Sequence, residues 1–232
     1  MTTIFKNENL QVIQQHIKNK YTIEFNKYTE QNAALIRSLI RTRIIQGATL
    51  SKDYLTLKFQ AHNINFFSQT NTLSIPEAAK CLETLATQLN YLLQHESKTI
   101  LGYNPNQIII INDTPAFLGS EFIADLDQCS KGTEGTESNM ATICCPFNPQ
   151  KDFFPAPELL KIKHLPAQVH FKVAYYSLAT LIIYGLNKEM KTEPNINPII
   201  YLDTHPIKNT KLYWLLSRCL EEDPNNRSIV FI

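Results

Sequence analysis

The stretch of sequence that decides the fold is Cys219-Leu220-Glu221-Glu222-Asp223-Pro224-Asn225-Asn226-Arg227. A second stretch upstream of it reads Phe154-Pro155-Ala156-Pro157-Glu158-Leu159. Between the two, Tyr176-Ser177-Leu178-Ala179 opens an apolar helical run. Each stretch alone is a weak signal, because Pro-Glu-Leu and Asp-Pro occur in many proteins. Three of them in one order along one chain are a much stronger signal than any single one.

These stretches resemble the C-terminal lobe of protein kinases. Residues 154–159 are similar to the Ala-Pro-Glu motif that closes the kinase activation segment. Residues 176–179 are similar to the Trp-Ser-Leu-Gly pattern on the central helix of that lobe, and residues 219–227 are similar to Cys-Leu-x-x-Asp-Pro-x-x-Arg. The resemblance implies a structural contact between Glu158 and Arg227.

The resemblance implies an α+β, protein-kinase-like fold with a small strand-rich N-lobe at residues 1–72 and a mostly helical C-lobe at residues 73–232. Over the first 70 residues it depends only on the order of strands and helices. The patterns there predict strands at residues 21–25, 54–59 and 63–67 and a helix at residues 29–46.

The second half of the chain has a strong helix start at Ser74, where Glu77 can close a capping box and Pro76 fits the first turn. Apolar spacing carries that helix to about His95. The remaining patterns predict short strands at 99–103, 108–111 and 122–125, a mobile loop at 130–140, and helices at 167–186 and 210–222.

The parts that hold the phosphates in a kinase have no good match. Kinase chemistry needs a glycine-rich loop and a lysine oriented by a helix glutamate. No glycine precedes Gly47, and residues 31–46 contain neither Asp nor Glu. The best lysine candidate is Lys27, and Glu30 is too near it in sequence to be its helix partner. A solvated lysine is therefore the expected state of Lys27.

The catalytic loop and the metal-binding motif are also degenerate. When Pro105 is set on the family's catalytic-loop proline, Gly102 takes the position of the catalytic aspartate and Gln107 that of the metal-binding asparagine. A glycine can neither accept a proton nor orient a hydroxyl. Asp125-Leu126-Asp127 is the match to Asp-Phe-Gly, so Asp125 and Gln107 are the candidate cofactor-binding residues. The alternative for the two aspartates is that they cap a turn.

Composition bounds the possible partners and compartment. The chain has 232 residues, 44% of them hydrophobic, which suffices for a core of one two-lobed domain or two small domains. Its net charge of +1 gives no overall attraction to nucleic acid or membrane lipid. The N-terminus lacks a signal-peptide core, the apolar run at residues 173–186 is short for a membrane span, and five scattered cysteines favour reduced thiols. We expect a cytoplasmic protein, and the Ile-, Lys- and Asn-rich style resembles kinase-like proteins of large DNA viruses, which extends the expectation to a host cytoplasm or a virion.

Other residue groups point to chemistry less strongly. Adjacent Cys144 and Cys145, even with His164 and His170 downstream, have poor spacing for zinc, so no metal site is expected. Arg37, Arg41 and Arg43 are expected to form a basic helix face. Tyr175, Tyr176 and the single Trp214 are expected in the core.

The resulting hypothesis is a pseudokinase: a catalytically inactive, kinase-like protein that needs no cofactor and binds another protein as a scaffold or regulator. It uses its helical lobe or the 130–140 loop for this. One alternative is a nucleotide-binding switch without phosphotransfer. Others are an enzyme with rearranged catalytic residues and a structural or assembly component, for example of a virion.

Overall fold

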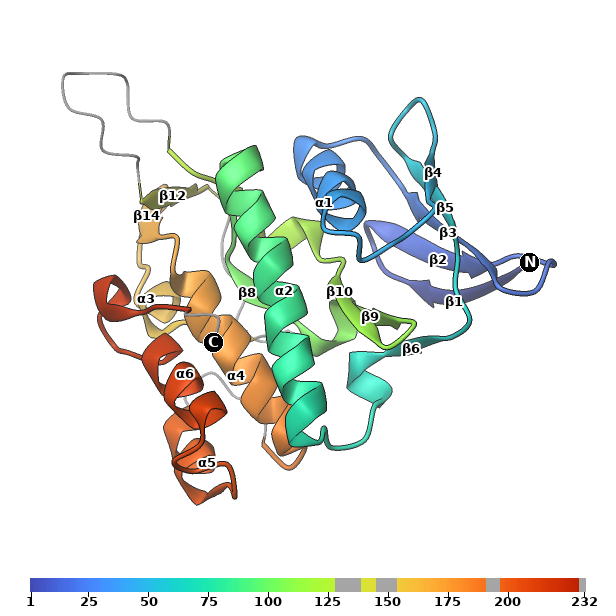
Figure 1. Cartoon of the computed structure of the whole chain (residues 1–232). Helices are drawn as coiled ribbons and strands as arrows, with labels where there is room; N and C mark the ends of the chain where they lie inside the picture. The colour runs from blue at the N-terminus through green and yellow to red at the C-terminus, as the bar shows by residue number, and fades with distance from the viewer. Residues whose placement is uncertain (128–138, 145–153, 191–196, 230–232) are drawn as a thin grey trace.

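The structure is a computed structural model of the chain, and it describes residues 1–127, 139–144, 154–190 and 197–229. It confirms a mixed α+β architecture with antiparallel strand pairing. A five-stranded sheet with helix α1 (Glu30–Arg41) lies at one end of the molecule (Figure 1). Helices α4 (Val173–Leu186), α5 (Pro198–Thr204) and α6 (Lys211–Cys219) lie at the other end, and helix α2 (Ile75–Glu96) runs between the two ends (Figure 1). Within the predicted loop at 130–140, residues 130–138 lie outside the described ranges.

The N-terminal sheet has the order β1-β2-β3-β5-β4. Its strands alternate inward apolar residues with outward polar ones, and Leu10, Val12, Ile23 and Leu57 are fully buried. The strands predicted at 21–25 and 54–59 are found as β3 and β5, whereas β1 and β2 were not predicted. The bounds are β1 (Thr2–Lys6), β2 (Leu10–Gln14), β3 (Lys20–Phe25), β4 (Thr49–Leu50) and β5 (Thr56–Gln60).

Helix α1 (Glu30–Arg41) packs beside this sheet and ends earlier than the predicted residue 46. The Thr29 side chain caps its start by accepting a hydrogen bond from the Asn32 amide. The helix stops because Arg43 adopts a left-handed φ of 60°, which turns the chain so that Ile44 and Ile45 enter the core. The predicted basic face of Arg37, Arg41 and Arg43 is therefore wrong, since Arg43 lies beyond the helix.

Helix α2 (Ile75–Glu96) forms the centre of the molecule. The Glu77 carboxylate accepts hydrogen bonds from the Ser74 amide and hydroxyl, as the capping pattern predicts. Against α2 lies a three-stranded sheet of order β10-β9-β6, made of β6 (Ile64–Phe66), β9 (Ile108–Ile111) and β10 (Thr114–Phe117). Because β6 pairs with β9, residues 64–66 join the second half of the chain, although the boundary at residue 72 assigns them to the first.

Three two-stranded ribbons connect distant parts of the chain. The first joins β7 (Lys98–Ile100) to β11 (Ile123–Asp125), and the second joins β8 (Gly102–Tyr103) to β13 (Phe154–Pro155). The third joins β12 (Met140–Ile143) to β14 (Ala167–His170). The predicted helix at 167–186 is therefore wrong at its start: residues 167–170 pair as a strand, and the helix begins at Val173.

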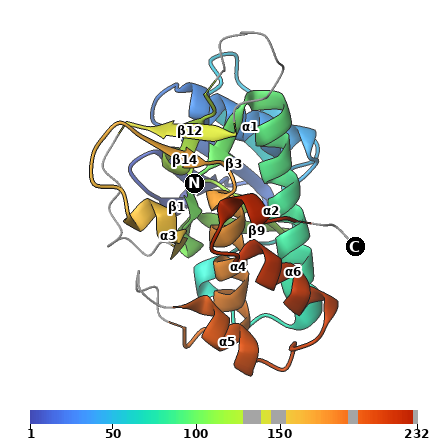
Figure 2. The ribbon, with the colours of Figure 1, turned by 90° about the vertical axis from the view of Figure 1, so that its left-hand side faces the viewer.

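The C-terminal half is built around α4 (Val173–Leu186), which is buried on nearly every side. Helices α5 and α6 cover one side of it (Figure 2). Within the predicted helix at 210–222, α6 covers only residues 211–219, and Trp214 is 56% exposed, so its predicted core position is wrong. Among the described helices none is long and apolar enough to cross a membrane. The other helices are α3 (Pro157–Leu160), α5 (Pro198–Thr204) and α6 (Lys211–Cys219).

Candidate functional site

Glu158 and Arg227 meet in a two-pronged contact, which is the contact that the resemblance implies. Arg227 Nη1 donates to Glu158 Oε1 at 2.5 Å, and Nη2 donates to Oε2 at 2.9 Å. The guanidinium is fully buried and also donates to the backbone carbonyls of Glu221, Glu222 and Lys172. Each of its three nitrogens thus has an acceptor, which is the condition for a buried charge to be tolerated.

The residues that precede Glu158 and Arg227 in the sequence orient both side chains. Pro157 starts the short helix α3, so Glu158 lies in its first turn. On the other side, the Asp223 side chain caps the turn that starts at Pro224 by accepting from the Asn225 amide at 2.9 Å. That turn ends at Arg227 and directs its side chain inward.

The segment matched to the catalytic loop lies between β7 and β9. Gly102 is buried in β8, opposite Pro155 of β13, and offers no side chain. Gln107 closes the 3₁₀ turn Pro105–Gln107 and is also buried. Its Nε2 donates to the Glu121 carboxylate, while its Oε1 has no hydrogen-bond partner among the described residues.

Gln107 also crowds the end of the β9–β10 hairpin. A Cβ atom added at Gly119 would clash with Gln107 Oε1 and with the ring of Phe117. Gly119 lies two residues after β10, so the chain leaves this hairpin through a position that only glycine fits without a shift of its neighbours.

Asp125 lies elsewhere, on strand β11. Its carboxylate forms an ion pair with Lys98, its cross-strand neighbour on β7, and accepts a longer bond of 3.4 Å from Gln31. Asp127 braces two strands instead of capping a turn, since it accepts from Thr142 and Gln168. No described contact joins Asp125 to Gln107, so the structure does not bring the two predicted cofactor-binding residues together.

The turn between β1 and β2 carries one carboxylate and is held by an asparagine side chain. Residues 7–9, which connect β1 to β2, read Asn-Glu-Asn. Asn7 Oδ1 accepts from the Asn9 and Leu10 amides, both at 2.8 Å, and this leaves Glu8 exposed. Lys27 follows β3 and is exposed, as expected of a solvated lysine.

Glu30, the one acidic residue of α1, contacts the nearby Tyr28 and Arg37. The Tyr28 hydroxyl donates to it at 2.5 Å, and this hydrogen bond lowers the pKa of Glu30. Arg37 lies 3.7 Å from its other oxygen.

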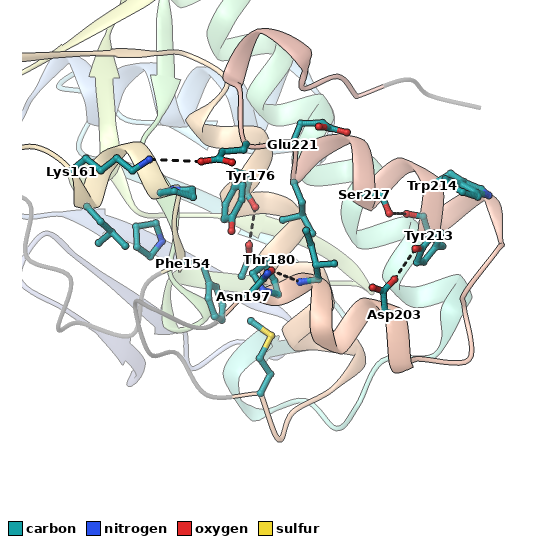
Figure 3. Close-up of a pocket in the computed structure, with 18 residues that line it drawn as sticks. Phe154, Lys161, Tyr176, Thr180, Asn197, Asp203, Tyr213, Trp214, Ser217 and Glu221 are labelled. Carbon is teal, nitrogen blue, oxygen red and sulfur yellow. Dashed lines mark hydrogen bonds and ion pairs between the residues drawn. The ribbon is translucent and has the colours of Figure 1, made fainter.

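A groove of about 730 Å³ is lined mostly by residues of the helical end of the molecule (Figure 3). Helices α3, α4, α5 and α6 supply most of its walls. Its apolar floor and sides include Phe154, Pro157, Leu160, Tyr176, Met190 and Ile199. Trp214 stands at its outer edge on α6, packed edge-to-face on Tyr213.

Three carboxylates and one lysine are the charged side chains among the described residues that line this groove. Asp203 accepts from the Tyr213 hydroxyl at 2.7 Å, and Glu221 and Glu222 follow the end of α6. Lys161 lies 4.0 Å from Glu222, and both side chains are highly exposed, so that ion pair is weak.

Sequence reasoning missed this groove, although one signal was available. In α6 the buried residues Leu212, Leu216 and Cys219 share one helical face, and Trp214 lies outside that face.

The described residues contain no group of three His, Cys, Asp or Glu that could hold a metal ion. Cys144 is exposed, and its neighbour Cys145 lies outside the described ranges. Burial raises the pKa of Cys81 and of Cys219 to about 12, so both thiols are inert near neutral pH.

Comparison with models of known protein families finds no match to the chain, and comparison with curated protein sequences finds none either. The functional argument therefore depends on the residues and geometry described above.

Proposed function

We propose that this chain is a pseudokinase: a protein-kinase-like fold that does not transfer phosphate and acts by binding another protein. The observation that carries the proposal is Gly102, which stands in the segment matched to the catalytic loop and has no side chain to accept the substrate proton. Four further features support it.

The first is the arrangement of elements. The chain runs through three strands, helix α1 and then two more strands of the same sheet, in agreement with the strand and helix order that the resemblance implies. The buried two-pronged contact of Glu158 with Arg227 is the feature that the C-lobe motifs imply. Such a contact between residues 69 positions apart has no local cause, and it therefore favours the fold proposal.

The second feature is the turn between β1 and β2. A kinase covers the nucleotide phosphates with a flexible glycine-rich loop whose amides approach them closely. Here the connection is the tight Asn7-Glu8-Asn9 turn, held by the Asn7 side chain. The exposed Glu8 carboxylate would repel a triphosphate, so tight phosphate binding is not expected.

The third feature is that glycine, and not an acidic residue, stands at position 119 where the chain leaves the β9–β10 hairpin, while the nearby Glu121 carboxylate accepts a hydrogen bond from Gln107. In kinases an aspartate and the catalytic-loop asparagine hold the magnesium ions together. In this chain Gly119 follows the hairpin, and the Gln107 side chain fills the space that a side chain there would need. Asp125 is engaged by Lys98. Because Glu121 is held by Gln107 and Asp125 by Lys98, we do not expect two free carboxylates to converge on one metal ion.

The fourth feature is the groove between α3, α4, α5 and α6, which offers an apolar surface on the helical part. Apolar, aromatic-rich depressions with a polar rim are typical of protein-binding surfaces. We therefore propose that the protein binds its partner protein through this face.

Thermal unfolding with and without magnesium-ATP tests the proposal against the nucleotide-switch alternative. A ligand at about 100 times its dissociation constant stabilises the folded state by about 2.7 kcal/mol, which would raise Tm by about 5–10 °C for a chain of this size. We expect Tm to shift by less than about 1–2 °C at roughly millimolar nucleotide. A site stays mostly empty at that concentration only if its dissociation constant is higher than millimolar. A dose-dependent shift of several degrees that needs magnesium would favour the switch instead.

A further inference from the structure

We propose that the groove between α3, α4, α5 and α6 binds a short segment of a partner protein in which lysine or arginine flanks bulky apolar residues. This inference rests on the proposed protein-binding function and names its partner class. Two independent properties of the groove, its exposed apolar surface and the charge of its rim, carry it.

The apolar surface is larger than folding of the helices requires. Trp214 is 56% exposed and Ile199 is 40% exposed, and both line the groove. The adjoining Ile200 on α5 is 63% exposed. Isolated exposed apolar residues are common, but several on two neighbouring helices beside a depression indicate an interaction surface. Tryptophan is also the residue most enriched among those that dominate binding energies.

The rim charge selects the partner. Asp203 lies on α5, and Glu221 and Glu222 follow α6, while Lys161 is the one cation among the described lining residues. Excess negative charge attracts lysine and arginine. It repels phosphate, which argues against a nucleic-acid or anionic-membrane partner at this face.

The rim is also held in place from inside. The buried Arg227 donates to the carbonyl of Glu221 at 2.7 Å and to that of Glu222 at 3.1 Å. Their backbone is therefore fixed, while their side chains remain exposed at the groove. A preorganised acidic rim loses less conformational entropy when a basic segment binds.

The size of the groove limits the occupant. Its volume of about 730 Å³ lies within the range of pockets that enclose one small ligand. It accommodates the side chains of a short segment, not the face of a whole domain.

The experiment is a selection of random peptides displayed on phage against the purified full chain, followed by titration of the selected synthetic peptides. The chain contains one tryptophan, and it lies at the groove, so its fluorescence reports occupancy of this site directly. We expect enriched peptides that combine basic and bulky apolar residues. We also expect a blue shift of Trp214 emission on binding, because the ring passes from water into an apolar contact.

Substitutions at the groove test whether the selected peptides bind there. Glu221→Gln with Glu222→Gln should weaken binding roughly tenfold at low salt and flatten its salt dependence. Trp214→Ala, followed by calorimetry, should weaken it roughly tenfold or more. Glu83→Gln with Asp113→Asn removes the same number of charges from exposed positions outside the groove lining and should leave the affinity unchanged.

The inference would be overturned by selected peptides without basic residues, or by binding that neither shifts Trp214 emission nor responds to the rim variants. Self-association of the chain through this face, detected by sedimentation and abolished by Trp214→Ala, would also overturn it, with a second copy as the occupant. None of these results bears on whether the chain transfers phosphate. Conversely, phosphate transfer by the chain would contradict the proposed function while leaving the peptide result intact.

Discussion

Arg227 is the residue on which the fold proposal depends most. Its guanidinium is fully buried and has five hydrogen bonds, two of them to Glu158. Removing one partner of a buried ion pair typically costs about 3–5 kcal/mol, because the other charge stays desolvated and unpaired. We therefore expect Glu158→Ala and Arg227→Ala each to lower the free energy of unfolding by roughly that amount, as measured by urea denaturation.

The double variant should lose much less than the sum of the two single losses. Arg218→Ala is the matched control, since Arg218 is exposed at the end of α6, and it should change the free energy of unfolding by less than about 0.5 kcal/mol. Additive losses in the double variant would contradict a direct coupling of Glu158 with Arg227.

The contact of Glu158 with Arg227 could be predicted from sequence, but the place of Asp125 could not. The family resemblance of the motif stretches implied the first, and in the structure a proline starts each of the two turns that carry the charged side chains. Asp125 was matched by composition alone. A short 3₁₀ turn, Ser120–Phe122, separates the β9–β10 hairpin from β11, and nothing in the hydrophobic pattern indicates where that turn falls.

At the scale of elements, helix α1 is bound to α2 and β10 by one buried amide. Gln88 on α2 is fully buried, and its side chain accepts from the Phe117 amide at 2.9 Å and donates to the Phe117 carbonyl at 3.1 Å. It also lies 3.1 Å from the hydroxyl of Ser38 on α1. Arg37 adds a two-pronged ion pair to Glu96 at the end of α2, with both bonds at 2.7 Å.

We expect Gln88→Met to destabilise the protein by about 2–5 kcal/mol. The substitution keeps the volume but leaves the Phe117 backbone groups buried without partners, and each unsatisfied group costs about 1–3 kcal/mol. Urea denaturation measures the loss, and hydrogen exchange should show faster opening of α1 amides. Gln94→Met on the same helix is the control, since Gln94 is exposed and should tolerate the change. Equal effects of the two substitutions would contradict the role assigned to Gln88.

Elements with a clear period were predicted well. The 22 residues of α2 were found with the predicted cap, since its apolar face and its Ser-Ile-Pro-Glu start agree. Residues 167–170 were misjudged as helix because they precede the apolar run of α4, whereas they pair with β12, a partner that local sequence does not reveal. Strands β1 and β2 are short and partly exposed, so the alternation of their apolar and polar residues was too weak to predict strands.

At the scale of the whole molecule, the predicted division into a strand-rich first part and a helical second part agrees with the α+β architecture. A single large apolar cluster extends from the N-terminal sheet through α2 to α4 and α6, so the two parts share one core. The groove is a product of this assembly, because its walls come from residues 154 to 222. The one local signal for this depression was the position of Trp214 outside the apolar face of α6, and it does not indicate how the helices assemble around it.

The central claim is that this fold transfers no phosphate, and incubation with γ-labelled ATP tests it most directly. The purified chain is mixed with magnesium or manganese, labelled ATP and generic protein substrates, with Asp125→Ala and Glu121→Gln as parallel samples. The account predicts incorporation no greater than that of a heat-inactivated sample, with no difference among the three proteins. Label transfer above that background, lost in Asp125→Ala or Glu121→Gln, would contradict it.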